Sequence, residues 1–507
     1  MLDFRKWPPT EADLERIKLY DHYEKVFDGN YLDAFAEGSC KVQEGEDRQY
    51  CGADWAKLVS LVSSDLLFGE RPIFSAGPDQ EQLNALVHHC DLFNKLYESS
   101  TSASFRGDAI LRLVAEEGQV NVYEIPAYNY FVELDPDNGR KVLSEAVAWV
   151  RRIDEDTAFL RVDHHYRGRI VRQAFRFSSG RFCDIPGSQQ TLAIASLADA
   201  YPDSELPPRE EELTGMDRSA LFHIPNWRHG SRYFGFSDYA GSILTLFDSY
   251  NERLSEIHRI LSEHADPKVL VPDGVLDEEG EIPWKDRNVI EIPSEYSRAA
   301  GDAFRYLVWE GQLHPAFQEL EKLADLIYKF TETSPAIFGE DKAGSIESAR
   351  AMKFRFTRTL SRISRKRNYW DRPIKDLLWW LQVLAARLRQ VVPYQNPDGT
   401  ITQIQIEEPT AGIAIGWQDG LPQDDKEQTE TESMRVQNGL TSRLKAIQRI
   451  DQVSEAEAQR ELDRITAEKD VQGVTDGFDP GTATGPGDPD RQFDEPGGAE
   501  PQPDFSN

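Results

Sequence analysis

The sequence predicts an α+β fold, in which a β-rich region is combined with long amphipathic helices. Residues 107–183 alternate apolar and polar side chains and are rich in β-branched and aromatic types, as antiparallel strands are. Turn signals such as DPDNG at 135–139 separate the strands. Other long stretches repeat apolar residues at three- and four-residue steps, which is the period of a helix.

The charge balance limits the classes of protein to which the chain can belong. Its 507 residues include 57 basic and 88 acidic side chains, which gives a formal net charge of −31. Affinity for a phosphate backbone comes mainly from Lys and Arg, so a surface this acidic repels nucleic acid unless a local patch dominates. The length allows several subdomains with a sizeable core.

The number of cysteines and the hydropathy of the chain indicate the cellular compartment in which the protein is expected. Four cysteines in so long a chain favour a reducing compartment and no disulfide framework. The N-terminus lacks the apolar run of a signal peptide, and no segment reaches the roughly 18 apolar residues of a membrane span. We therefore expect a soluble intracellular protein that does not enter a membrane.

The region before the strands is predicted to be helical. Thr10, followed by acidic residues, is typical of a helix start over 9–29. Gly69, followed by Pro72, indicates the end of a helix over 53–68. A further helix is predicted over 79–99.

Two long helical patterns flank a module that breaks the pattern. The first runs from Asp238 to His264 and the second from His314 to Thr333. Between them, 265–312 contains four prolines and short strand-like runs such as KVLV and NVIEI. The sequence thus predicts a small mixed module inserted between two long helices.

A third helical pattern is unusually long. It follows a Pro- and Gly-containing loop at 334–345, begins at Ser345 and lasts to about Gln390. Pro373 lies inside it and removes a backbone donor, so we expect a kink near Asp371–Arg372.

The C-terminal part is predicted to contain a strand pair, then helices, then a tail. The strands flank NPDG at 396–399, and the helices fill 425–469 with a break at Asn438–Gly439. From 471 the chain is rich in Gly, Pro and Asp, with eight acidic residues and one basic residue, which predicts disorder.

The run KFRFTRTLSRISRKRNYW, at 353–370, is strongly basic in an acidic chain. On a helix, four of its arginines form one charged stripe beside an apolar stripe: Arg355, Arg358, Arg362 and Arg365. Such a helix could contact nucleic acid or a membrane surface. The alternative, which the overall acidity favours, is that the stripe pairs with carboxylates of the same assembly.

Motifs for catalysis or cofactor binding are absent from the sequence. It contains no GxxxxGK[ST], no GxGxxG and no GxSxG. HHC at 88–90 and DHH at 163–165 lack the spacing of a metal site, because adjacent residues point in different directions. We therefore expect no enzyme activity, no catalytic residue, no metal and no cofactor.

Four stretches, and the order of the elements around them, resemble one family. The stretches are LLFGERPIF at 66–74, HIPNWRHGSRYFGFSD at 223–238, SIESARAMKFRFTRTLSRISRKRNYWDRPIKDLLWWL at 345–381 and GLPQDDKEQTETESMRVQNGLTSRLKAI at 420–447. An α+β domain leads into a long helix, an inserted module, a returning helix, a short loop and a very long helix. Up to about residue 470 the chain resembles the portal proteins of tailed double-stranded DNA bacteriophages, in the branch of long non-contractile-tailed phages.

The resemblance implies a portal-protein fold with a helical stem, a mixed α/β wing and clip, a helical crown and a disordered acidic C-terminal tail. The implied parts are an α+β wing at 1–236, stem helices at 237–264 and 313–333, a clip at 265–312, a tunnel loop at 334–345, a long kinked helix with wing strands at 346–424, a crown at 425–470 and the tail at 471–507.

The resemblance also implies partners and sites. The chain would form a homo-oligomeric ring, a dodecamer, at one vertex of a virion capsid, after assembly in the host cytoplasm. Double-stranded DNA would pass through the ring during packaging and ejection. The expected protein partners are the terminase large subunit, the head–tail connector (adaptor) protein, and the major capsid and scaffold proteins. Asp341 and Lys342 would face DNA from the tunnel loop, and the clip would contact partners through Trp284, Lys285, Asp286 and Arg287.

Two other interpretations stay open at the level of sequence. The chain could be an acidic DNA-associated regulatory protein that uses helix 353–370 as its nucleic-acid contact, or a hydrolase without a recognisable motif. On the portal interpretation the basic stripe lies in the ring wall. Its arginines would then form salt bridges with carboxylates of the same or an adjacent subunit.

Overall fold

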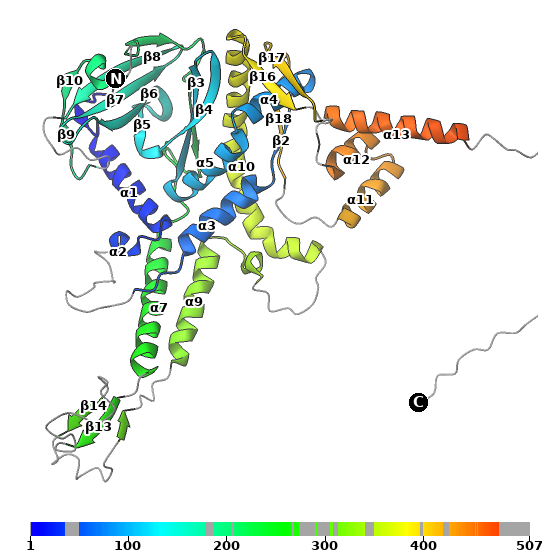
Figure 1. The fold of residues 1–507 in the computed structure, drawn as a ribbon. Coiled ribbons are helices and arrows are strands. Elements are labelled where there is room, and N and C mark those ends of the chain that lie inside the picture. The colour runs from blue at the N-terminus through cyan, green and yellow to red at the C-terminus, as the bar shows by residue number, and fades with distance from the viewer. Residues whose placement is uncertain are drawn as a thin grey trace, which may run out of the picture.

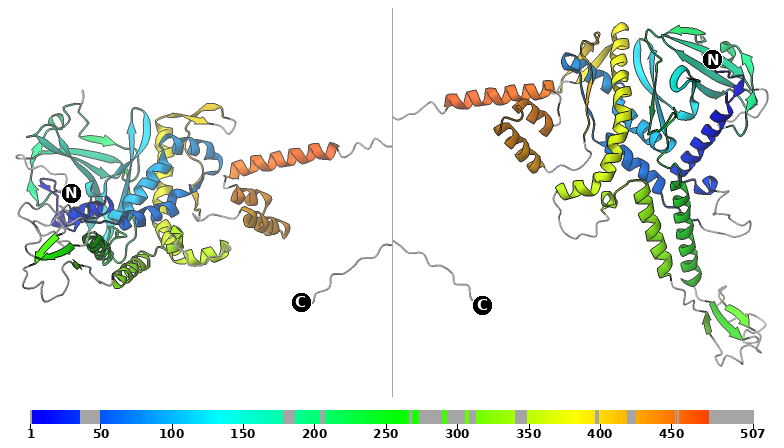
Figure 2. Two further views of the ribbon diagram at one scale, coloured as in Figure 1. Left: turned by 60° about the horizontal axis from the view of Figure 1, so that its bottom comes forward. Right: turned by 180° about the vertical axis from the view of Figure 1, so that it is seen from behind.

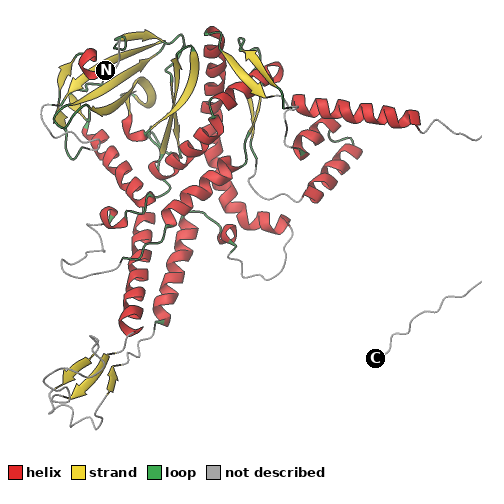
Figure 3. Cartoon of the chain, viewed as in Figure 1, coloured by secondary structure: helices red, strands yellow, loops and turns green. Residues whose placement is uncertain are grey.

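A computed structural model shows the α+β architecture that the sequence predicts (Figure 3). Strands gather in one part of the body, and helices cross the body and extend from it. Two long helices protrude side by side and carry a small sheet at their far end (Figure 1). The residues that the structure describes are 2–35, 50–177, 186–203, 207–265, 268–272, 289–292, 305–307, 313–339, 349–395, 399–418, 425–451, 453 and 455–475.

The N-terminal helices follow short-range signals, with one exception. Thr10 caps the first helix, because its side-chain oxygen accepts a hydrogen bond from the backbone N–H of Asp13. The single helix predicted over 79–99 is wrong: two helices meet at Asp91, whose φ of 48° is left-handed. The helical elements here are α1 (Glu11–Phe27), α2 (Tyr31–Ala34), α3 (Trp55–Ser64), the π-helix η1 (Asp65–Gly69), η2 (Gly77–Asp79), α4 (Gln80–His89) and α5 (Leu92–Arg106).

Two antiparallel sheets form the β-rich region that the alternation at 107–183 predicts. The larger sheet has the order β10–β8–β7–β6–β5, with β11 also paired to β8, and the smaller has the order β12–β3–β4. A buried ion pair between Arg112 and Asp163, 2.7 Å apart, joins the two sheets. Their strands are β3 (Asp108–Glu116), β4 (Gln119–Ile125), β5 (Tyr130–Asp135), β6 (Asn138–Arg152), β7 (Ala158–Tyr166), β8 (Arg169–Arg176), β10 (Ala193–Ala195), β11 (Glu211–Leu213) and β12 (Leu221–Pro225).

Short strand pairs and helical turns complete the body. The strands β16 and β17 form the hairpin predicted around NPDG, and β18 pairs with β2, which lies more than 300 residues earlier in the chain. The remaining short elements are β1 (Lys6–Trp7), β2 (Ile73–Ser75), η3 (Ala127–Asn129), β9 (Gln190–Thr191), α6 (Leu197–Ala200), η4 (Pro335–Phe338), β16 (Val391–Gln395), β17 (Ile401–Gln405) and β18 (Ala414–Gly416).

The protruding pair consists of α7 (Ile243–Ala265) and α9 (His314–Phe330). The views in Figures 1 and 2 agree that they run side by side away from the body, and Arg253 of α7 bridges to Glu319 of α9 at 3.0 Å. The module between them contains the two strands predicted from KVLV and NVIEI. These are β13 (Lys268–Pro272) and β14 (Val289–Ile292), which pair in parallel, and β15 (Arg305–Leu307) pairs antiparallel with β13.

The helix α10 (Ala349–Arg387) is the longest element and crosses the body. Its apolar side chains Trp370, Ile374, Leu377 and Leu381 are buried against α4 and the three-stranded sheet. Each such side chain contributes about 1.5–3 kcal/mol by burial, which holds α10 firmly in the core.

The C-terminal region contains three helices rather than the predicted two. The break at Asn438–Gly439 is confirmed, and a second break follows Ile450, where Asp451 ends a helix. The last helix continues to Thr475, so it extends beyond the predicted start of the tail at 471. The helices are α11 (Asp425–Gln437), α12 (Arg443–Ile450) and α13 (Glu455–Thr475).

Two glycines allow the loop at 226–238 to pack closely on the end of α5. A Cβ atom on Gly235 would lie only 2.1 Å from the backbone oxygen of Gly107, and Gly107 itself has a left-handed φ of 103°. The backbone N–H of Gly235 also donates to Asp108, at 2.8 Å. This close approach sets the position of the residues that lead into α7.

We predict that Gly235→Ala destabilises the fold. The added methyl group would collide with backbone rather than with a movable side chain, so the free energy of unfolding should fall by about 1–3 kcal/mol or more. The measurement is the midpoint of thermal unfolding followed by circular dichroism. Gly187→Ala is the control, because a Cβ there meets no atom within 4 Å, and an equal midpoint for the two variants would contradict the prediction.

Candidate functional site: a buried ion cluster on helix α10

Asp238 stands at the end of the loop that leads into α7. Its backbone N–H donates to the carbonyl oxygen of Ser104 on α5, at 2.8 Å. One of its carboxylate oxygens accepts hydrogen bonds from the Ser104 hydroxyl at 2.6 Å, and the other accepts from the Asn226 amide at 3.0 Å. These hydrogen bonds to α5 and to its own loop fix the position of the Asp238 side chain independently of its ion pairs.

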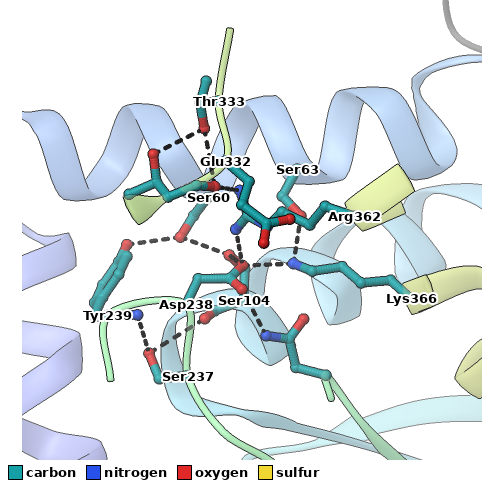
Figure 4. Close-up of polar contacts among 12 residues, drawn as sticks. Ser60, Ser63, Ser104, Ser237, Asp238, Tyr239, Glu332, Thr333, Arg362 and Lys366 are labelled. Carbon is teal, nitrogen blue, oxygen red and sulfur yellow. Dashed lines mark hydrogen bonds and ion pairs between the residues drawn. The ribbon is translucent and has the colours of Figure 1, made fainter. Parts of the chain in front are cut away.

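Two cations of α10 complete the environment of this carboxylate (Figure 4). The guanidinium of Arg362 lies 2.7 Å from Asp238, and the ammonium of Lys366 lies 2.5 Å from it. The exposed fractions of the three side chains are 4% for Asp238, 8% for Arg362 and 3% for Lys366. An ion cluster buried this deeply is stable only because every charge has a partner.

The electrostatics follow from burial and pairing. Burial alone would raise the pKa of Asp238, but Arg362 and Lys366 outweigh it, and the pKa lies well below its ordinary value. Burial lowers the pKa of Lys366 to about 8, with Asp238 opposing the change and Arg362 adding to it. Lys366 therefore remains mostly protonated at neutral pH, and the cluster is ionic.

The same face of α10 also holds the segment that follows α9. Arg362 donates to the carbonyl oxygen of Thr331 at 2.5 Å, and Thr359 donates to the carbonyl oxygen of Glu332 at 2.8 Å. The backbone N–H of Ser334 in turn donates to the Thr359 hydroxyl, at 3.0 Å. One helix therefore binds the chain immediately before α7 and immediately after α9.

A second acid, Glu332, receives the outer arginines of the stripe. Its carboxylate lies 2.7 Å from Arg358 and 2.5 Å from Arg365. These arginines are 72% and 53% exposed, so solvent screens both pairs and each contributes little to stability. The inner cluster at Asp238 is the one that constrains the fold.

Hydroxyl groups continue the network into α3. The ammonium of Lys366 donates to the Ser63 hydroxyl at 2.6 Å, and the Ser60 hydroxyl lies 3.0 Å from Ser104 and 2.7 Å from the Tyr239 hydroxyl (Figure 4). Tyr239 donates to the carbonyl oxygen of Ala56 at 2.7 Å. The cluster thus joins α3, α5, α10 and the chain segments at the base of α7 and α9.

The arrangement supports a mechanical role. The charged groups of the cluster are paired with one another and almost fully buried, and they join separate elements of the chain. In the part of the chain that the structure describes, no group of three or more His, Cys, Asp or Glu side chains could hold a metal ion. None of the described helices is long and apolar enough to cross a membrane.

The structure brings part of the predicted basic stripe together with acids of the same chain. Arg358, Arg362 and Arg365 pair with Glu332 or Asp238, whereas Arg355 is half-buried near the start of α10. Salt bridges between subunits stay a prediction. Sequence reasoning missed Asp238 and Glu332 as the partners, and it missed the part of Lys366 in the buried cluster.

Other predicted residues lie elsewhere. Pro373 is inside α10, which continues through it, and the ribbon of α10 changes direction near its yellow-green N-terminal end (Figure 1). The kink at Asp371–Arg372 stays a prediction. Asp341 and Lys342 of the tunnel loop, and Trp284, Lys285, Asp286 and Arg287 of the clip, fall outside the described residues.

The structure thus combines an α+β body, a protruding helix pair and a long helix that binds the base of that pair. A family model described as "Phage portal protein, SPP1 Gp6-like" matches residues 237–473, which include α7, α9, α10 and the ion cluster from Asp238 onward. The resemblance inferred from the sequence is confirmed over these residues, which match the model of the phage portal protein family.

Solved structures that match the chain come from gene transfer agent (GTA) particles. One is titled as the virion of the native particle, with 11% identity, a TM-score of 0.40, and coverage of 83% of this chain and 98% of that one. A second, the neck of the empty particle computed with C6 symmetry, has 11% identity, the same coverage and a TM-score of 0.42. A third, the neck of the native particle computed with C12 symmetry, has 11% identity, a TM-score of 0.39, and coverage of 78% and 89%. No curated protein matches the chain.

We predict that Asp238→Asn strongly destabilises the protein. The change leaves Arg362 and Lys366 buried without their counter-charge, which should cost about 3–5 kcal/mol. The pKa of Asp238 is depressed in the folded state, so its stabilisation is present above its ordinary value of 3.8 and is lost as the pH falls below that value. Unfolding midpoints measured between neutral pH and acid should therefore fall less steeply in the variant than in the wild type.

The matched control for this prediction is Glu332→Gln. Its two arginines are largely exposed, so the loss should stay below about 1 kcal/mol. Similar midpoints for the Asp238 and Glu332 variants, or an unchanged acid dependence in Asp238→Asn, would show that the buried cluster does not constrain the fold.

Proposed function

We propose that the chain assembles into a ring at one vertex of a virus-like capsid and that DNA passes through the ring. The proposal rests most directly on the portal-family match over 237–473. In it, the ring serves DNA packaging, retention and ejection, and it is a docking platform for the terminase large subunit and the head–tail connector. The major capsid and scaffold proteins would surround it at the vertex.

The helix pair supports self-association. The apolar side chains Leu261 of α7, and Phe317 and Phe330 of α9, are 47%, 44% and 57% exposed in the single chain. Along α9, no described side chain before Ile327 is fully buried. Two helices alone cannot cover both apolar stripes, so neighbouring copies placed side by side would complete the burial. A contact between two different faces of the same chain closes a ring when the rotation allows it.

Charge supports the passage of DNA. A channel that binds DNA tightly would stall it, and a net charge of −31 per chain makes the ring repulsive overall. The basic stripe does not reverse this, because Arg358, Arg362 and Arg365 are paired with acids of the same chain. The alternative function, a regulator that binds DNA through helix 353–370, loses its main support for the same reason.

The parts of the portal can be assigned within this proposal. The stem would be 237–264 and 313–333, which contain almost all of α7 and all of α9, and 265–312 would be the clip that docks the terminase and the connector. The segment 334–345 would be the tunnel loop. The body before 236, with 346–424, would be the wing, and 425–470 would be the crown.

We predict that the purified chain forms rings. Mass photometry should show a species of roughly a dozen subunits, each of 57.7 kDa, and negative-stain images should show a central hole. The species should persist over a range of salt, because the proposed contacts bury apolar surface. Only monomers or dimers at every salt and protein concentration would contradict the proposed function.

We also predict a weak contact of Lys342 with the DNA phosphates. A single ion pair in contact with water contributes at most about 1 kcal/mol, so Lys342→Ala should lower the packaging rate by about two- to fivefold without abolishing it. Lys342→Arg keeps the charge and is the control. The readout is the amount of nuclease-protected DNA over time in a packaging reaction, and an unchanged rate in Lys342→Ala would remove this role from Lys342.

A further inference from the structure

An open groove with a volume of about 630 Å³ lies at the base of α13. Strand β2, helix α4 and the β16–β17 hairpin form it, and Glu457 near the start of α13 reaches its edge. Its wall is aromatic: Phe74 stacks on Phe93 with ring centres 5.4 Å apart, and the guanidinium of Arg71 lies 5.2 Å above the Phe93 ring. None of the residues that line the groove belongs to the ion cluster on α10, and the groove is largely apolar whereas the cluster is ionic.

The groove exposes apolar side chains at its rim. Ile401 on its rim is 70% exposed, and the neighbouring Tyr394 is half-buried. Apolar side chains grouped around a concavity are typical of a site that receives an apolar side chain. The groove also has one acid, Glu457, and one cation, Arg71, beside which an acidic neighbour of that side chain could lie.

The C-terminal tail has the complementary composition. Residues 476–507 carry eight acidic residues, one basic residue, Arg491, and three phenylalanines: Phe478, Phe493 and Phe505. We propose that this tail binds in the groove of its own chain, with Phe493 against the aromatic wall and the adjoining Asp490 and Asp494 near Arg71.

The length of the tail favours binding within the same chain. From Glu457 to Thr475 the helix α13 spans about 27 Å at 1.5 Å per residue. The 18 residues from 476 to 493 have a root-mean-square span of about 21–25 Å if flexible, and of up to about 60 Å if extended. Phe493 can therefore return to the groove, whereas Phe478, three residues beyond α13, reaches only about 10 Å.

Because the length of the tail suits the distance from the end of α13 to the groove, the groove can be occupied even if its intrinsic affinity for the tail is weak. A flexible tether whose length suits the distance gives an effective concentration in the millimolar range, so even millimolar intrinsic affinity leaves the groove about half occupied. Most of the surface of a chain with net charge −31 repels an acidic tail, and this favours a groove that offers Arg71 and an apolar wall.

The test is photo-cross-linking in the full-length chain. The photoreactive residue p-benzoylphenylalanine replaces Phe493, the protein is irradiated, and cross-linked peptides are identified by mass spectrometry. We expect cross-links to peptides that contain Phe93 or Ile401, within the monomer band of a denaturing gel. The same label at Phe478 is the reach control and should give no groove cross-link. The readout does not depend on ring formation.

Two substitutions test whether the cross-link depends on the apolar surface of the groove. Ile401→Asp removes an apolar contact and adds repulsion, and should lower the groove cross-link by about tenfold. Leu213→Asp is the matched control, because Leu213 is also an exposed aliphatic residue but lies on β11, and it should have no effect. Cross-links from position 493 that are scattered over the surface, that join two chains, or that survive Ile401→Asp unchanged would each overturn the proposal.

Discussion

The buried carboxylate of Asp238 is the group on which the placement of the protruding helices depends. It lies five residues before the start of α7 and contacts Arg362 and Lys366, both on α10. Arg362 also binds the carbonyl oxygen of Thr331, immediately after α9. One guanidinium therefore contacts the base of both helices. Neither base can move relative to α10 without leaving a buried charge or carbonyl group unpaired, which is costly in an interior closed to water.

This cluster positions the helices more than it stabilises the protein. A buried ion pair often contributes little net stability compared with apolar side chains of similar volume, because both charges lose their hydration. The cluster has specific partners near the bases of α7 and α9, and we hypothesise that it favours one arrangement of these helices on α10. It also has an electrostatic consequence: the carboxylates of Asp238 and Glu332 offset part of the positive charge of the most basic stretch of the chain.

Local patterns predict the elements well and the cluster poorly. The apolar periodicity of α7, α9 and α10 locates each helix to within a few residues, since the pattern reflects which face is buried. The break at Asp91 was missed because an isolated left-handed residue leaves no periodic signal. The pair Asp238–Lys366 joins residues 128 positions apart, and an acid before a helix looks like an ordinary helix-start acid. Only the resemblance of the whole order of elements indicated which helices lie together.

A double-mutant cycle between Asp238 and Lys366 tests the central claim most directly, namely that this contact holds the base of the helix pair to α10. The free energy of unfolding is measured for the wild type, Asp238→Asn, Lys366→Met and the double variant. The account predicts a coupling energy of about 1–3 kcal/mol, with the double variant less destabilised than the sum of the two single variants. Additive effects, within about 0.5 kcal/mol, would contradict it.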